Sequence, residues 1–196
     1  MSARARAVRP RGEAGQSLIE FAMVLPFLVV VVFGVIEVSY ALLDQHVVTS
    51  FSREGSNLIS RNTSLRDAVT AMRQMTSRPL DLDNGSSKII LSVVRRVSTP
   101  SAANYDRVIL YQRTQYGTLA ASSQLTGGGG AFGPAPDYQA LDPDNDTALR
   151  IGNLPVTLPR GGTLYITEVF AKHMTLTPID GFGLRVPDRL YSIAYF

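Results

Sequence analysis

The chain has 196 residues, 19 Lys and Arg against 16 Asp and Glu, a formal net charge of +3 and no cysteine. The lack of cysteine excludes disulfides, thiolate metal ligands and a lipidated cysteine anchor. Residues 1–15 contain four Arg and one Glu, which together account for +3, so residues 16–196 have a formal charge of zero. Because the positive charge is confined to this leader, no basic stripe of the kind that binds nucleic acid is expected.

A long apolar segment follows the leader. No charged residue occurs from Phe21 to Ile36, and apolar character resumes after Glu37 and continues to Leu43. As a helix, residues 21–43 would measure about 34 Å, enough to cross a hydrocarbon core of about 30 Å. Arginines precede the segment and none occurs between Phe21 and Phe51, which predicts a cytoplasmic N-terminus and an outer location for the rest. We therefore expect a single-pass protein of the inner (cytoplasmic) membrane.

Two other interpretations of the apolar segment were considered. A secretory signal peptide would use Ser39-Tyr40-Ala41 as its small-x-small cleavage site, but the segment is much longer than a signal core of about 7–15 residues. A plain uncleaved anchor explains the topology and leaves Glu20 unexplained. An ionisable group at the start of a membrane helix is costly unless it is paired, so Glu20 is a candidate functional residue.

The N-terminal sequence resembles a known family. Gly15, the run Gln16 to Ala22 and the run Val24 to Leu28 together resemble the N-terminus of TadE-like pseudopilins of the tight-adherence (Tad/Flp) pilus system. The same region is similar to class III signals, which a prepilin peptidase cuts on the cytoplasmic face. The resemblance continues through Phe33 to Glu37 and Ser52 to Gly55, and more loosely through Ile166 to Phe170 and Leu176 to Pro178.

The resemblance implies roles for individual residues. Gly15 would precede the scissile bond, where the absence of a side chain lets a protease approach the backbone closely. Gln16 would become the new N-terminus, where many pilins have an aromatic or apolar residue, so N-methylation stays open. Glu20 would be the fifth mature residue, with its carboxylate facing the new α-amine of its own or a neighbouring chain. Such a pair in low dielectric sets the axial register of packed helices.

The implied partners are a prepilin peptidase, other Tad pseudopilins, the Flp major pilin, and the inner-membrane platform with its assembly ATPase. Pro26 and Gly34 lie within the apolar segment. A membrane proline frees a backbone carbonyl, and a glycine often marks close helix approach, so both are assigned to helix packing. Either would also suit an ordinary anchor. Glu37 is expected at the outer membrane interface, solvated and without a special role.

The remaining sequence predicts an α+β domain of pilin-like plan. Apolar residues at helical spacing extend the first helix beyond the membrane, and Asn62-Thr63-Ser64 breaks it. Ser64 with Asp67 resembles a capping box that starts a second helix over residues 65–76. Strands rich in Val, Ile, Leu and Tyr are expected at residues 88–97, 105–116, 163–176 and 189–196, forming an antiparallel sheet packed on the helix. The predicted regions are a leader at 1–15, a transmembrane helix at 16–43 and an outer domain at 44–196.

Residues 117–162 are expected to be an irregular, flexible surface loop. Their glycine run at 127–130 lacks the Gly-Lys-Ser/Thr ending of a phosphate-binding loop. Alternating acids at Asp142, Asp144 and Asp146 leave open a low-affinity calcium site, although Thr147 and Asn153 occupy the sixth and twelfth positions, where an EF-hand needs Gly and Glu. A solvated turn is the default interpretation, and no other cofactor is expected.

No catalytic constellation is present in the sequence. The two histidines, His46 and His173, stand alone, and neither HExxH nor GxSxG occurs. We therefore expect a protein that is not an enzyme. The leading interpretation is a minor pseudopilin of a Tad-type pilus, too long for the major Flp subunit and shorter than the TadG-like members. The alternative is an uncleaved, membrane-anchored binding protein of the cell envelope.

Overall fold

The computed structural model describes residues 13–178, 181, 183 and 186–196. The four arginines of the predicted leader fall outside the described residues. The chain divides into two compact units, one of residues 1–40 with 175–186 and the other of residues 41–174 with 187–196. They are called here the N-terminal unit and the sheet unit, and each is considered separately.

Helix α1 runs without interruption from Glu13 to Ser60 and includes Pro26. Its apolar side chains between Leu18 and Leu43 are largely exposed, with Phe27 at 71% and Met23 at 77%. A helix of this length and composition is a candidate membrane span, because exposed aliphatic and aromatic side chains of this density require an apolar surrounding. The chain therefore has the features of a membrane-anchored protein.

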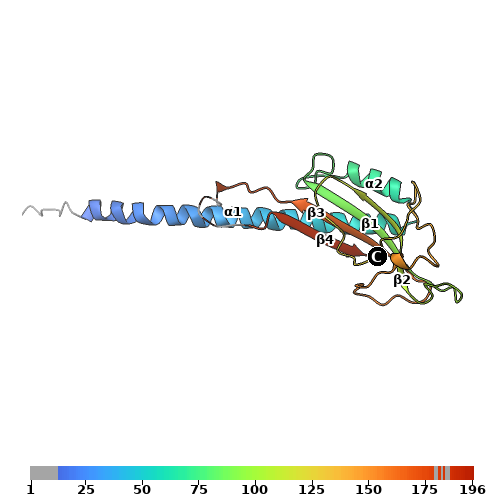
Figure 1. The fold of residues 1–196 in the computed structure, drawn as a ribbon. Coiled ribbons are helices and arrows are strands. Elements are labelled where there is room, and N and C mark those ends of the chain that lie inside the picture. The colour runs from blue at the N-terminus through green and yellow to red at the C-terminus, as the bar shows by residue number, and fades with distance from the viewer. Residues whose placement is uncertain (1–12, 179–180, 182, 184–185) are drawn as a thin grey trace, which may run out of the picture. The chain divides into compact units, whose positions relative to one another are not determined.

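The sheet unit contains one antiparallel sheet with the strand order β2-β1-β3-β4. Figure 1 shows this sheet with the short helix α2 and the later part of α1. The elements are α2 (Leu65–Gln74), β1 (Ser87–Arg96), β2 (Val108–Tyr116), β3 (Thr163–Lys172) and β4 (Arg189–Tyr195), with the 3₁₀ turn η1 at Thr147–Leu149. The α+β class and the antiparallel sheet predicted from the sequence are thereby confirmed.

Two strand limits differ from the prediction. β2 begins at Val108 rather than at residue 105, because Tyr105 and Asp106 form a turn in which Asp106 has φ of 62°. β3 ends at Lys172 rather than at residue 176. The next residue, His173, is buried, and its Nδ1 lies 2.7 Å from Asp44 Oδ2 of α1. Lys172 is the last residue of β3 that pairs with β4, opposite Arg189.

The main core lies between the sheet and the two helices. Side chains of α1, α2, β1 and β3 bury one another on this face of the sheet; they include Val48, Phe51, Ile59, Leu65, Met72, Ile89, Leu91 and Val169. Burying an aliphatic side chain of this size contributes roughly 1.5–3 kcal/mol, so this cluster is the principal source of stability. The Ser64 side chain accepts a hydrogen bond from the Asp67 N–H and starts α2, as the capping pattern predicted.

Gly55 permits the close packing of α1. A β-carbon at this position would lie 2.7 Å from Met72 Cε and 2.7 Å from Thr167 Cγ2. Ser52 and Ser56, on the same part of α1, contact β4 through Ser192 Oγ at 2.8 Å and the Ala194 carbonyl at 2.9 Å. Small residues in this stretch therefore let the helix approach both β3 and β4.

Residues 117–162 are irregular, as predicted, but they are not wholly a surface loop: one part packs on the opposite face of the sheet and another runs along β2, where Gln112 bridges Gln139. Leu125 and Leu158 join a buried cluster with Val94, Leu110 and Ile166, and Leu149 packs near Ile109. The segment has η1 as its one regular element and otherwise consists of turns and isolated bridges. Gly127 has φ of 91°, and a β-carbon there would lie 2.1 Å from the Arg150 carbonyl oxygen. Close backbone packing accounts for this part of the glycine run.

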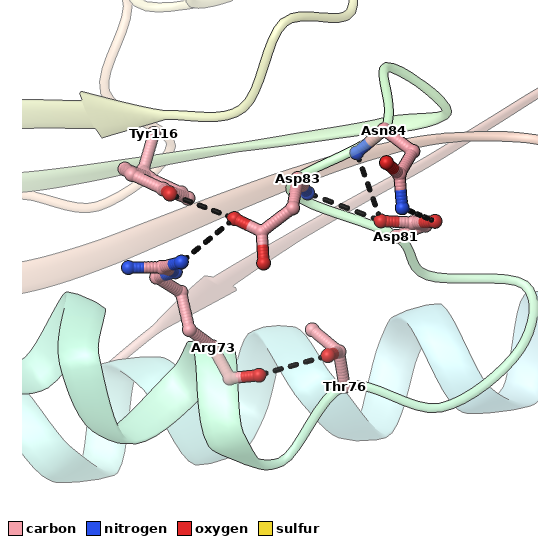
Figure 2. A network of polar contacts seen from close by, with 6 residues as sticks. All are labelled: Arg73, Thr76, Asp81, Asp83, Asn84 and Tyr116. Carbon is pink, nitrogen blue, oxygen red and sulfur yellow. Dashed lines mark hydrogen bonds and ion pairs between the residues drawn. The ribbon is translucent and has the colours of Figure 1, made fainter.

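A polar network fastens the connection between α2 and β1 (Figure 2). Arg73 Nη2 lies 2.9 Å from Asp83 Oδ1, the same oxygen accepts the Tyr116 hydroxyl at 2.7 Å, and the guanidinium stacks over the Tyr116 ring at 4.8 Å. The tyrosine hydrogen bond, followed by Arg73, lowers the pKa of Asp83. The hydrogen bond to Asp83 raises the pKa of Tyr116. These exposed contacts tie three elements together at modest energetic gain.

Candidate functional site

The predicted processing site occupies the first turns of α1. Gly15 is exposed, and a β-carbon built there meets nothing within 4 Å, so no packing inside the chain requires glycine. Gln16 Nε2 donates a hydrogen bond to Glu20 Oε1 at 3.0 Å, one helical turn along. Glu20 is likewise exposed on this helix surface. The roles predicted for these three residues concern a protease and neighbouring chains, and they stay predictions.

The two predicted packing residues lie farther along the same helix. Pro26 and Gly34 follow Glu20 by about 9 Å and 21 Å at 1.5 Å per residue. Pro26 is exposed and Gly34 is partly buried. The predicted residues are therefore arranged along one helix rather than gathered into a single cluster, which is an arrangement suited to contacts with other helices.

Glu37 of the N-terminal unit has a carboxylate that accepts several hydrogen bonds. Glu37 is 0% exposed, which corrects the expectation of a solvated residue without a special role. Its Oε2 accepts the Thr177 N–H at 2.9 Å and the Thr177 hydroxyl at 2.7 Å. The Leu176 N–H lies 3.2 Å from Oε1 and 3.1 Å from Oε2. These contacts, formed by Glu37, Leu176 and Thr177, are called here the Glu37 clasp.

The clasp has a clear energetic reason. An isolated carboxylate is strongly disfavoured in an apolar surrounding, and hydrogen bonds from backbone amides and hydroxyls compensate the lost hydration. Two N–H groups and one hydroxyl supply such donors here. The clasp therefore lets an acid remain inside an otherwise apolar stretch and holds residues 176–177 against α1.

One signal in the sequence pointed to the clasp. Leu176 to Pro178 resembled a family segment, and Glu37 belonged to another segment of the same resemblance. Glu37 and Leu176 are 139 positions apart in the sequence, and no helical or strand periodicity relates residues at that separation. The sequence placed both segments within the resemblance, but it showed neither that Glu37 is buried nor which residues bind it.

A second buried acid lies in the sheet unit, on the face covered by residues 117–162. Glu168 of β3 is 0% exposed and accepts the Gln124 N–H at 2.7 Å and the Tyr191 hydroxyl at 3.1 Å. The Ser123 hydroxyl also donates to Glu168, and Ser123 Oγ accepts a bond from Arg113 Nη2 at 3.3 Å. Glu168 thus joins the covering segment, β3 and β4 at one point.

The environment of Glu168 changes the proton affinity of its neighbours. Burial lowers the pKa of Arg113, while the charge of Glu168 acts in the opposite direction. Burial first and the Glu168 charge second raise the pKa of Tyr191 well above its ordinary value. Tyr191 therefore stays protonated and donates its hydroxyl proton to the carboxylate across the physiological range. The group acts as a rigid hydrogen-bonded fastener.

The acids considered for calcium serve local turns. Asp142 Oδ1 accepts the Asn145 N–H at 3.1 Å, and Asp146 Oδ1 accepts the Ala148 N–H at 3.0 Å, which caps η1. Within residues 13–178 and the described positions that follow, no group of three or more His, Cys, Asp or Glu side chains is arranged to hold a metal ion. The low-affinity calcium site stays an open prediction.

The long exposed apolar helix and the α+β unit define the class: a protein with one candidate membrane-spanning helix and one antiparallel-sheet unit. Residues 15–57 match the model of the TadE-like protein family, which confirms the resemblance seen in the N-terminal sequence. The matched stretch contains Gly15, Glu20, Glu37 and Gly55, while most of the sheet unit lies beyond it. Neither a curated protein nor a solved structure matches this chain.

Proposed function

We propose that the protein is a minor pseudopilin of a Tad-type pilus, a structural and assembly subunit with no catalytic activity of its own. The observation that carries this proposal is the match of residues 15–57 to the TadE-like family, in a stretch that begins at the predicted cleavage glycine. The exposed apolar surface of α1 supports it, because the same surface suits a lipid bilayer before assembly and neighbouring helices afterwards.

The proposed sequence of events begins with insertion of α1 into the inner membrane. The arginine-rich leader stays in the cytoplasm and the sheet unit lies on the outer side. A prepilin peptidase then cleaves the peptide bond between Gly15 and Gln16. Hydrolysis leaves a carboxylate on Gly15 and a free α-amine on Gln16, one helical turn from Glu20.

The new α-amine gives Glu20 its proposed role in assembly. An ammonium and a carboxylate in an apolar surrounding attract strongly, and each compensates the burial of the other. A pair formed between chains would align their helices axially. Incorporation would bring the chain into contact with other Tad pseudopilins and the Flp major pilin, through the inner-membrane platform and its ATPase, and so contribute to adherence.

Intact mass and N-terminal sequencing of the membrane-extracted protein, with and without the cognate prepilin peptidase, test the proposal. A peptidase-dependent start at Gln16 is expected. An intact leader in both samples would instead leave an uncleaved, membrane-anchored binding protein of the envelope. A start near Leu42 would indicate a secreted domain and would overturn both.

A further inference from the structure

A groove opens on the face of the sheet unit that residues 117–162 cover. Its volume is about 720 Å³, within the range of roughly 300–1,000 Å³ typical of binding sites. One wall is the segment Leu119 to Ser122, and the floor and opposite wall come from β1, β3 and β4. Lys88, Ala120, Ala121, Phe170, Arg189 and Tyr191 are among the residues that line the groove.

The floor of the groove is aromatic and its rim is basic. Lys88 pairs with Phe170 across β1 and β3, and Phe170 pairs with Tyr191 across β3 and β4, so the three side chains share one face. The two rings lie 4.8 Å apart between centroids. Arg189, two residues before Tyr191, also belongs to this face. Opposite Arg189, Lys172 adds a third cation beside the groove.

These cations are available to a ligand. Lys88 Nζ donates one bond to the Ala121 carbonyl at 2.7 Å, which leaves two of its three ammonium protons for other acceptors. Across the described part of the chain, neither Lys88 nor Arg189 forms an ion pair with an acid. Unneutralised cations around an apolar floor favour a ligand that carries negative charge.

The groove is held open by Glu168, and this makes it preformed. The carboxylate binds the Gln124 N–H at 2.7 Å, next to the Leu119–Ser122 wall, and the Tyr191 hydroxyl at 3.1 Å on the other side. Both walls are therefore fastened to one buried group. A site that does not have to form on binding avoids part of the entropy cost of association.

The wall also offers backbone groups. Among the described residues, no hydrogen bond engages the N–H groups of Leu119, Ala120, Ala121 or Ser122, and the segment belongs to no strand. Free main-chain donors are what an incoming extended peptide pairs with in strand addition. A polysaccharide would satisfy the cations but would not supply the main-chain groups of a peptide.

We propose that this groove binds an extended, acidic polypeptide segment of a partner protein. Main-chain hydrogen bonds to Leu119–Ser122 provide alignment, and Lys88 and Arg189 select acidic side chains. Phe170 and Tyr191 receive the apolar side chains between them. The proposal does not depend on cleavage after Gly15 or on a pilus role, because it rests on the sheet unit alone.

The test uses the full chain in detergent micelles and a fluorescein-labelled dodecapeptide of alternating Glu and Val, with binding followed by anisotropy. Arg189→Gln and Lys88→Gln should each weaken binding about tenfold or more, since each removes charge-assisted hydrogen bonds. Arg107→Gln is the matched control, because Arg107 is an exposed arginine without an ion pair in the described chain, and it should bind as the unaltered protein does.

Additional variants and ligands distinguish a peptide-binding groove from a polysaccharide site or a nonspecific charge effect. Ala120→Trp fills the groove while keeping both cations and should abolish binding, with circular dichroism confirming that the fold is retained. The same peptide with Gln for Glu, or with N-methylated backbone amides, should bind at least tenfold more weakly. The proposal is overturned if Arg107→Gln weakens binding as much as Arg189→Gln. It is equally overturned if polygalacturonate displaces the peptide and N-methylation has no effect, since the groove would then be a polysaccharide site.

Discussion

Thr177 gives Glu37 both its backbone N–H, at 2.9 Å, and its hydroxyl, at 2.7 Å, although the two residues are 140 positions apart. A single residue thereby supplies two donors to one oxygen of a fully buried carboxylate. The contact fastens a late segment of the chain to the apolar helix. It lies inside the N-terminal unit and is independent of the core that holds the sheet.

Replacing the acid should release the fastened segment. In Glu37→Gln, the amide group presents N–H donors toward the donors of Leu176 and Thr177, so part of the clasp is lost. Hydrogen exchange at these two amides should accelerate about tenfold or more, the equivalent of one lost charge-assisted hydrogen bond. The measurement is hydrogen exchange with mass spectrometry in micelles. Glu20→Gln is the matched control, and equal exchange in both variants would contradict the clasp.

Removing Glu168 should destabilise the sheet unit. Glu168→Ala leaves the Gln124 N–H and the Ser123 and Tyr191 hydroxyls without their acceptor and removes the charge that compensates the burial of Arg113, for an expected loss of about 3 kcal/mol in the free energy of unfolding. Denaturant unfolding followed by circular dichroism measures it. Gln124→Ala should change little, because Gln124 contacts Glu168 through its backbone. A large effect of Gln124→Ala would show that this assignment is incorrect.

Blocking the cleavage site should not disturb the fold. In Gly15→Leu, the added side chain prevents close approach of the peptidase to the backbone, while the new β-carbon meets nothing within 4 Å. We expect an uncleaved chain by intact mass and an unchanged circular dichroism spectrum. Normal cleavage of this variant would argue against Gly15 as the residue before the scissile bond.

Glu20 should be needed for assembly rather than for insertion. Glu20→Ala removes the carboxylate proposed to pair with an α-amine, so pili should be absent in electron micrographs while the protein still fractionates with the membrane. Gln16→Ala is an informative comparison, since it removes the 3.0 Å hydrogen bond to Glu20 and keeps the carboxylate. Pili are expected in that variant. Normal piliation of Glu20→Ala would exclude the proposed role.

The Arg73–Asp83–Tyr116 network should weaken in acid. Because the folded-state pKa of Asp83 is lowered, its stabilising contribution is present above the unfolded-state value of about 4 and is lost as pH falls through the folded value. The thermal midpoints of the unaltered chain and Asp83→Asn should therefore converge on acidification below about pH 4. Asp137→Asn serves as control, as Asp137 is an exposed acid without a hydrogen bond in the described chain. A constant difference between the unaltered chain and Asp83→Asn would contradict the expectation.

Local elements were predictable because their signals are local. Ser64 and Asp67 lie three positions apart, and the helix that they start begins at Leu65, as predicted. β1 and β4 fall within one residue of the predicted limits. Glu20 likewise stood out by its position five residues after Gly15. These features depend on spacings of a few residues, which a sequence displays directly.

Residues 117–162 show where this reasoning failed. Gly and Pro predicted an irregular segment, and η1 is its one regular element. The composition did not reveal that Leu125 and Leu149 are buried against the sheet. Burial of an irregular segment depends on which strands lie beneath it, and the pairing of those strands is set by contacts between distant positions.

The sequence by itself determined the apolar helix, the candidate cleavage glycine, the α+β class and the similarity of residues 15–57 to TadE-like proteins. Tertiary structure alone decided that Glu37 and Glu168 are buried and which groups bind them. The reason is physical: from the sequence alone, an acidic side chain is expected to be exposed to solvent. Only folding brings the Thr177 and Gln124 donors to it, across separations of 140 and 44 residues.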